Sequence, residues 1–330
     1  MKRCNVIFLL VVIVWMATPQ SREKEPLRLV QTISMPLVRG RIDHMAVDPE
    51  GERVFVAALG NHSLEILRMR TGQQMGRIEG LNEPQGVVYL PESNKIFVAN
   101  GGDGTCKMFD GDTLQPITSI NLSGDADNVR YDLSSKQLFV GYGDGGIAAV
   151  DATDGKRLGD IPLEGHPESF QLEKSGPRIF ANVPKAGHVA VIDRSKRTVV
   201  ATWPLQGARA NFPMALDEAH HRLFVGCRQP ATVVVLDTTS GQAVIKLTIA
   251  RDTDDLFYDE VHKRIYVSCG EGYINVFDQL DPDHYLAVAK IATATGARTS
   301  LFAPTLDRLY LAVPRRGNQP AQIQVYAVQK

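Results

Sequence analysis

Polar side chains recur along the 330-residue sequence at an almost constant spacing. Seven positions share it: Asp43, Gln85, Asp127, Glu168, Phe212, Asp254 and Arg298. The steps between them are 42, 42, 41, 44, 42 and 44 residues, and four of the seven side chains are carboxylic acids. Carboxylates that meet in one place repel each other, which raises the pKa of some of them or recruits a cation. A fold that brought these positions together would therefore create an acidic site.

Further polar residues stand beside members of this series: His44, Asn128, His166, Asn211 and Asp255. Carboxylate and amide oxygens suit Ca2+ or another divalent cation, and the candidate metal ligands are Glu168, Asn128, Asn211 and Asp254. Two histidines, His44 and His166, are candidate acid or base groups and would make a softer metal possible. The alternative interpretation is a set of polar loops that hold only solvent.

The sequence contains none of the common catalytic or metal-binding fingerprints. It has no His-Glu-x-x-His or Cys-x-x-Cys spacing for zinc, no Gly-x-Ser-x-Gly turn for a nucleophilic serine and no phosphate-binding loop. Any chemistry at the acidic positions therefore depends on how the fold brings them together.

An apolar, aromatic, apolar triplet repeats with the same period. Its seven copies are residues 54–56, 96–98, 138–140, 179–181, 223–225, 265–267 and 309–311. Turn-forming residues flank each copy, and helical periodicity is absent. Seven copies of this length predict an all-β, seven-bladed β-propeller with four-stranded antiparallel blades. The innermost strands of such a ring begin at one mouth of a central channel, so the seven polar positions would surround that mouth.

The ends of the repeat array predict how the ring closes. The seventh copy stops after its third strand, residues 323–329, and lacks a fourth. A strand-like segment before the first copy, residues 27–35, can complete that blade and remove an open sheet edge. We therefore expect one propeller domain over residues 22–330, with both ends of the repeat array in one blade.

Residues 1–21 have a different character. Lys2 and Arg3 precede an apolar run of 12 residues, 6–17. This pattern predicts a signal peptide, with an uncleaved N-terminal anchor as the alternative. The protein is then expected to be periplasmic or secreted, and to touch a membrane only if the segment is retained.

Charge and cysteine content limit the partners and the redox chemistry. The formal net charge of -1, with scattered Lys and Arg residues, provides no basic surface for nucleic acid. Cys106, Cys227 and Cys269 are too few, and odd in number, for a fold built on disulfides. Cys227 and Cys269 occupy equivalent positions in neighbouring repeats, and we expect two buried thiols there, with a disulfide or a thiolate ligand pair as the alternative.

The stretch Ile-Phe-Val-Ala-Asn-Gly-Gly-Asp-Gly-Thr at residues 96–105 resembles the repeat of the YVTN or YncE-like propeller family. The likeness covers residues 27–330, although no copy spells the Tyr-Val-Thr-Asn tetrapeptide itself. The resemblance implies a bacterial or archaeal propeller that commonly works outside the cytoplasm. It implies no particular reaction, because most members of the family have none assigned.

Three functions are compatible with these patterns. The leading hypothesis is a monomeric binding module that holds a small ligand, or a protruding segment of a partner protein, at the acidic mouth. The second is a metal-dependent hydrolase or lyase, because lactonase propellers, similar in outline but six-bladed, place acidic and amide ligands around a central cation. The third is a docking subunit for a redox partner, which would resemble the heavy chain of quinoprotein amine dehydrogenases.

Overall fold

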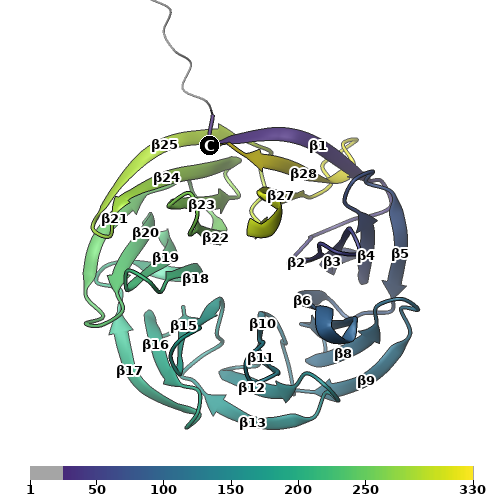
Figure 1. Ribbon diagram of the computed structural model, residues 1–330, viewed down its shortest axis with the longest axis horizontal. Coiled ribbons are helices and arrows are strands. Elements are labelled where there is room, and N and C mark those ends of the chain that lie inside the picture. The colour runs from purple at the N-terminus through teal and green to yellow at the C-terminus, as the bar shows by residue number, and fades with distance from the viewer. Residues whose placement is uncertain (1–24, 330) are drawn as a thin grey trace, which may run out of the picture.

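The computed structural model describes residues 25–329, which form seven four-stranded antiparallel sheets arranged as the blades of a ring (Figure 1). In blades 1 and 2 the strands are β2 (Met45–Asp48), β3 (Arg53–Ala58), β4 (Ser63–Arg68), β5 (Gln74–Glu79), β6 (Pro84–Leu90), β7 (Lys95–Asn100), β8 (Thr105–Asp110) and β9 (Pro116–Asn121). In blades 3 and 4 they are β10 (Val129–Asp132), β11 (Gln137–Tyr142), β12 (Gly146–Asp151), β13 (Arg157–Pro162), β14 (Phe170–Leu172), β15 (Arg178–Val183), β16 (His188–Asp193) and β17 (Thr198–Pro204).

The remaining strands follow the same order from the channel outward. In blades 5 and 6 they are β18 (Arg209–Asp217), β19 (Arg222–Gln229), β20 (Ala231–Asp237), β21 (Ala243–Thr248), β22 (Thr253–Asp259), β23 (Arg264–Cys269), β24 (Tyr273–Asp281) and β25 (His284–Ala292). Blade 7 combines β26 (Ser300–Ala303), β27 (Arg308–Val313) and β28 (Ala321–Val328) with the N-terminal β1 (Leu27–Met35). Three short 3-10 helices, η1 (Leu59–Asn61), η2 (Pro91–Ser93) and η3 (Pro304–Leu306), lie in turns.

The ring closes as the sequence predicts. β1 pairs antiparallel with β28, from Leu27 opposite Val328 to Met35 opposite Ala321. The two ends of the repeat array therefore share one sheet, and β28 has hydrogen-bonding partners on both sides. The prediction of a seven-bladed propeller closed by residues 27–35 is confirmed.

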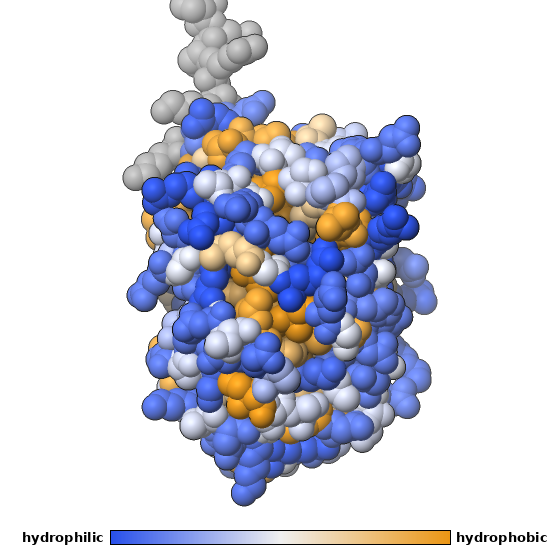
Figure 2. Space-filling model, turned by 90° about the vertical axis from the view of Figure 1, so that its right-hand side faces the viewer, coloured by the Kyte–Doolittle hydropathy of each residue, from blue (hydrophilic) through white to orange (hydrophobic). Residues whose placement is uncertain are grey.

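The aromatic residue of the repeated triplet packs one blade against the next. In three places its ring lies beside an aromatic ring on the innermost strand of the following blade: Phe55 with Tyr89, Phe224 with Tyr258, and Tyr266 with Phe302, with centroids 5.5, 5.3 and 5.3 Å apart. The triplets are buried because the inner strands are covered on both faces by neighbouring sheets. With most apolar side chains inside the blades, the side of the ring that Figure 2 shows is mostly hydrophilic, and its apolar side chains lie in separate patches.

Aspartates at the ends of several third strands stabilise the turns that follow them. Asp110 accepts a hydrogen bond from the backbone N–H of Thr113 at 2.8 Å, and Asp237 accepts one from Thr239 at 2.9 Å. Such side chains replace a backbone partner in a tight turn, which explains why aspartate recurs at this position.

The cysteines Cys106, Cys227 and Cys269 are free thiols inside the blades, so the expectation of buried thiols at Cys227 and Cys269 is confirmed. Burial raises the pKa of both of these thiols to about 12, which keeps them protonated. Within residues 25–329 no helix is long and apolar enough to cross a membrane. The predicted signal peptide or anchor lies outside the described residues.

Because β1 covers the outer edge of β28, we expect ring closure to limit stability. A chain that begins at residue 36 should lose cooperative thermal unfolding, whereas one that begins at residue 25 should retain it. A milder test uses Ile33, which is buried, and Val30, which is exposed on the same strand. Ile33→Asp should lower the free energy of unfolding by about 2–5 kcal/mol and Val30→Asp by less than about 1 kcal/mol. Equal melting curves for the two variants, followed by circular dichroism, would contradict this role.

Candidate ligand site at a mouth of the channel

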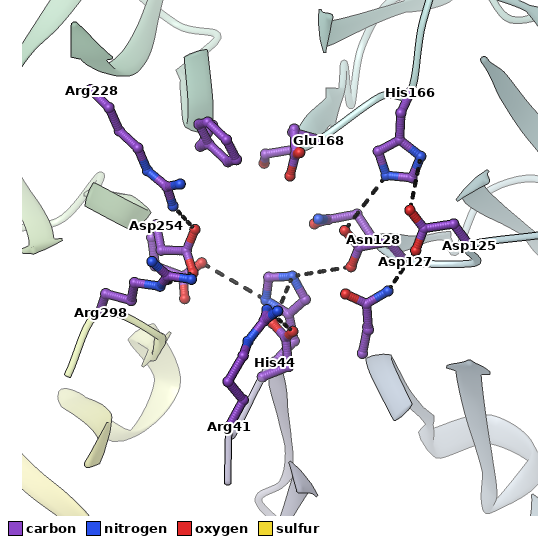
Figure 3. Close-up of a pocket in the computed structure, with 15 residues that line it drawn as sticks. Arg41, His44, Asp125, Asp127, Asn128, His166, Glu168, Arg228, Asp254 and Arg298 are labelled. Carbon is purple, nitrogen blue, oxygen red and sulfur yellow. Dashed lines mark hydrogen bonds and ion pairs between the residues drawn. The ribbon is translucent and has the colours of Figure 1, made fainter. Parts of the chain in front are cut away.

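A polar cavity of about 200 Å³ lies at one mouth of the channel, and all seven positions of the repeated series line it. Six of them reach it because they stand at, or just before, the start of an innermost strand, and Phe212 reaches it as the fourth residue of β18. Asp43 precedes β2, Asp127 precedes β10, Glu168 precedes β14, and Asp254 is the second residue of β22. Figure 3 shows the side chains of Asp127, Glu168 and Asp254 entering the cavity from different blades.

The neighbouring residues that the sequence analysis singled out separate into two groups. His44, Asn128, His166 and Asp255 line the cavity. Asn211 is not among its lining residues, because adjacent residues of a strand point to opposite sides and Phe212 faces the cavity instead. The Asn211 amide nitrogen donates to the side-chain oxygen of Asn182 at 2.9 Å and to the His188 carbonyl at 3.0 Å.

Three charged lining residues, Arg41, Asp125 and Arg228, are missing from the sequence-based set. Arg41 and Asp125 each stand two residues before a member of the series, as His166 does, so the same alignment extended by two positions would have found them. Arg228 comes from the end of β19, the second strand of its blade. Its position in the sequence relative to the repeated series therefore does not predict that it lines the cavity.

The guanidinium groups at the mouth are all engaged with carboxylates. Arg41 lies 2.9 Å from Asp43, while Arg228 and Arg298 both contact Asp254, the latter at 3.0 Å (Figure 3). The Arg228 guanidinium also stacks on the Phe212 ring, with its central carbon 3.5 Å from the ring centroid. These cations are therefore already neutralised within the cavity wall.

His44 occupies the centre of an acidic cluster. Its Nε2 lies 3.8 Å from Asp43 and 3.7 Å from Asp127, and its Nδ1 lies 3.9 Å from Asp255. Burial alone would lower the pKa of His44, but the three carboxylates outweigh burial and raise it above its usual value. The imidazolium thus supplies a positive charge shared by blades 1, 3 and 6.

Three carboxyl groups hold their protons more tightly than usual. Burial is the main cause, and it raises the pKa of Asp43 to about 6 and those of Asp255 and Glu168 to about 7. For Glu168 the nearby charge of Asp127 adds to the effect. At neutral pH the cavity therefore contains carboxyl groups close to their titration midpoints.

Asp127 and His166 form a pair in which each side chain favours the charged form of the other. Burial favours the neutral acid at Asp127, but the two nearby histidines, with His166 Nε2 at 3.8 Å from its carboxylate, lower its pKa overall. Burial would lower the pKa of His166, but Asp127, the Gly143 carbonyl and Asp125 raise it to about 9. His166 Nδ1 donates to that carbonyl at 2.7 Å, which fixes the ring against the loop of blade 3.

The groups without partners at the mouth are acceptors. Asp127 Oδ1 and Asn128 Oδ1 are both buried and have no hydrogen-bond partner, and Asn128 is only 4% exposed. Within residues 25–329 the Glu168 carboxyl group forms no salt bridge and no side-chain hydrogen bond. Buried acceptors without partners are costly, so this wall favours a ligand that brings hydrogen-bond donors.

The structure does not bring the four candidate divalent-cation ligands together as one free set. Among the described residues no group of three or more His, Cys, Asp or Glu side chains is arranged to hold a metal ion. Asn211 lies outside the cavity, and Asp254 is occupied by two guanidiniums.

The raised pKa values predict that stability falls as pH rises. Asp43, Asp255, Glu168 and His166 all hold a proton in the folded chain at pH values where the unfolded chain has lost it. The free energy of unfolding should then decrease between about pH 4 and pH 9, and the melting temperature should drop by about 5 °C from pH 5 to pH 8.

The control for this prediction is Asp255→Asn, which retains an oxygen for the Ser300 N–H that Asp255 accepts at 2.6 Å. It should flatten the pH dependence measured by differential scanning calorimetry. A melting temperature that stays constant or rises from pH 5 to pH 8 in the wild-type protein would refute the assignment.

Comparison with known proteins adds a distant relationship. No protein-family model matches the chain. Two proteins named YncE, from Salmonella typhimurium and Salmonella typhi, are each 22% identical over 300 residues, covering 83% of this chain and 84% of theirs. Both are described as uncharacterized, so they bring no activity with them.

Solved structures agree on the architecture. A chain in the crystal structure of the mitotic checkpoint complex has a TM-score of 0.79 at 12% identity and covers 99% of both chains. A chain of Kuenenia stuttgartiensis hydrazine synthase has a TM-score of 0.75 at 16% identity, covering 88% of this chain and 98% of its own. At these identities the likeness concerns the fold alone. The chain is thus a distant homologue of YncE with the fold of a seven-bladed β-propeller.

Proposed function

We propose that this propeller of the YncE kind is a binding module whose acidic mouth holds a small organic cation, in particular a primary ammonium ion. The observation that carries the proposal is the unused acceptor capacity of Asp127 Oδ1, Asn128 Oδ1 and Glu168. An ammonium group has three N–H donors and no acceptor, so it complements a wall of oxygens.

The balance of charge supports a cation over an anion. Six carboxyl groups line the cavity, against three guanidiniums and two imidazoles. The lining carries one excess negative charge when every group is ionised, which requires Asp255 and Glu168 to have lost the protons that they partly hold at neutral pH. An anion would meet arginines that are already paired with Asp43 and Asp254, together with oxygens that repel it.

The dimensions favour a compact ligand. The cavity of about 200 Å³ is smaller than the roughly 300–1,000 Å³ of sites for drug-sized molecules. It is open to solvent at the mouth, so a lysine side chain on a protruding partner segment offers the same ammonium group as a free amine. The free amine is the simpler occupant, since it needs no complementary protein surface.

We further propose that the propeller works outside the cytoplasm. The support is the charged and apolar pattern of Lys2, Arg3 and residues 6–17, which is typical of a signal peptide. The full chain expressed in a bacterium should appear in the periplasmic fraction, with an intact mass that lacks about 21 N-terminal residues. Full-length protein recovered from the cytoplasmic fraction would contradict the proposal.

The proposed amine site predicts a defined ligand preference. In thermal-shift and calorimetric titrations, primary amines of up to about six carbons should stabilise the protein, whereas the matched alcohols and carboxylates should not. Because Glu168 has a pKa of about 7, its ionised fraction rises from about one tenth at pH 6 to about nine tenths at pH 8. The affinity for the amine should therefore rise up to about tenfold over this range, since the amine stays protonated.

Matched variants test the same site. Glu168→Gln should weaken amine binding at least tenfold at pH 8 and remove most of its pH dependence. Glu164→Gln is the control, because Glu164 lies in the same loop, is 73% exposed and does not line the cavity. Equal binding of amines and carboxylates, or unchanged amine affinity in Glu168→Gln, would rule the proposal out. Binding of a lysine-bearing peptide without binding of free amines would show that the site takes a lysine side chain of a partner protein.

A further inference from the structure

We propose that the central channel contains a second binding site, which takes an apolar organic anion and anchors its carboxylate on Arg130. The site lies beyond the mouth cavity, and the inference does not rest on the amine-binding function.

The channel encloses its own cavity of about 400 Å³. Much of its wall is apolar and comes from the innermost strands, including Val47 of β2, Val88 of β6, Phe257 of β22 and Leu301 of β26. These residues stand two to four positions after the mouth residues of the same blades, so they lie deeper along the channel at about 3.3 Å per residue.

His44 and Asp255 line both cavities. They therefore form the partition between the acidic mouth and the channel. The only charged side chains that line the channel cavity in the described chain are this pair and Arg130. Arg130 does not line the mouth cavity.

Arg130 is a cation without an ion pair. Its Nη1 donates to the Val129 carbonyl at 2.9 Å and its Nη2 donates to Ser169 Oγ at 3.3 Å, which accounts for two of its five N–H donors. Within residues 25–329 it forms no salt bridge, in contrast to Arg41, Arg228 and Arg298.

The nearby carboxylates do not neutralise this guanidinium directly. Burial lowers the pKa of Arg130, and the charges of Asp255 and Asp127 offset that effect only from beyond ion-pair distance. In the adjoining groove, Asp132 pairs with Arg194 and Glu173 pairs with Arg178. An anion that entered the channel would therefore meet an available donor group whose burial is costly when unpaired.

The wall and the donor together select the chemistry of the occupant. A planar guanidinium with free N–H groups binds a carboxylate through two parallel hydrogen bonds. The aliphatic and aromatic wall suits an alkyl or aryl body and offers little to a highly hydrated anion such as phosphate. The ligand class is thus a monoanion with one apolar end, for which octanoate is a suitable probe.

The experiment is calorimetric titration of the folded propeller with octanoate, octanol and octylamine. Octanoate should bind at least tenfold more tightly than octanol, and Arg130→Gln should weaken octanoate at least tenfold while leaving octanol unchanged. Arg28→Gln is the charge-matched control, because Arg28 is exposed on the outer strand β1. Arg130→Lys should restore part of the affinity, since it restores the charge without the fork of donors.

Val88→Phe provides an independent test if Arg130→Gln melts at a much lower temperature than the wild type. It keeps the guanidinium but fills the channel, and it should also reduce octanoate binding at least tenfold. Absence of octanoate binding to the wild-type protein at millimolar concentration would overturn the proposal. So would equal affinities for octanoate in wild type and a folded Arg130→Gln variant, which would leave Arg130 as a balancing charge for Asp127 and Asp255. Preference for octylamine over octanoate would also overturn it, because the Asp255 carboxylate and not Arg130 would then select the ligand.

Discussion

Closure of the ring by β1 and β28 is the constraint on which the rest of the structure depends. Nothing within a single blade directs the start of its innermost strand toward a shared axis. Only when the last sheet is completed by the first strand do the seven starts form a ring. The convergence of six carboxyl groups at one mouth is thus a long-range consequence of pairing between residues about 300 positions apart. Closure also removes the open edge that would otherwise compete for other strands.

Convergence creates an electrostatic difficulty that the lining solves in two ways. Arg41, Arg228 and Arg298 neutralise carboxylates directly, and two of these guanidiniums reach Asp254 from neighbouring blades. Where burial outweighs the nearby cations, the acid groups retain protons, as the raised pKa of Glu168 and Asp255 shows. Asp43 shows both effects, because its pKa is raised to about 6 although Arg41 contacts it. Both solutions reduce the cost of burying like charges, and the second leaves groups whose charge changes near neutral pH.

The fold could be predicted from the sequence because its signal is periodic, whereas the state of each site residue depends on contacts between blades. A 42-residue period determines the number of blades, and the short seventh copy determines how they close. Placement at the mouth follows from the same register, which brings Asp43 and Glu168 to one cavity although they are 125 positions apart. A one-residue shift is enough to lose this information, as Asn211 and Phe212 illustrate on opposite faces of β18. Arg298 belongs to the aligned series, but Arg228 arrives from a second strand, so no alignment of innermost strands reveals this second contact with Asp254.

Cationic side chains at and beyond the partition explain why the acidic mouth is tolerated. The imidazole of His44 is shared among Asp43, Asp127 and Asp255. Below that partition, Arg130 acts on Asp127 and Asp255 through the protein interior without touching either. Charges separated in this way attract each other more strongly than they would in water, because little solvent lies between them to screen the interaction. Removing the charge of His44 or Arg130 would therefore alter the pKa of the carboxyl groups near them. The mouth and the channel are thus electrostatically one unit, even though His44 and Asp255 separate their cavities.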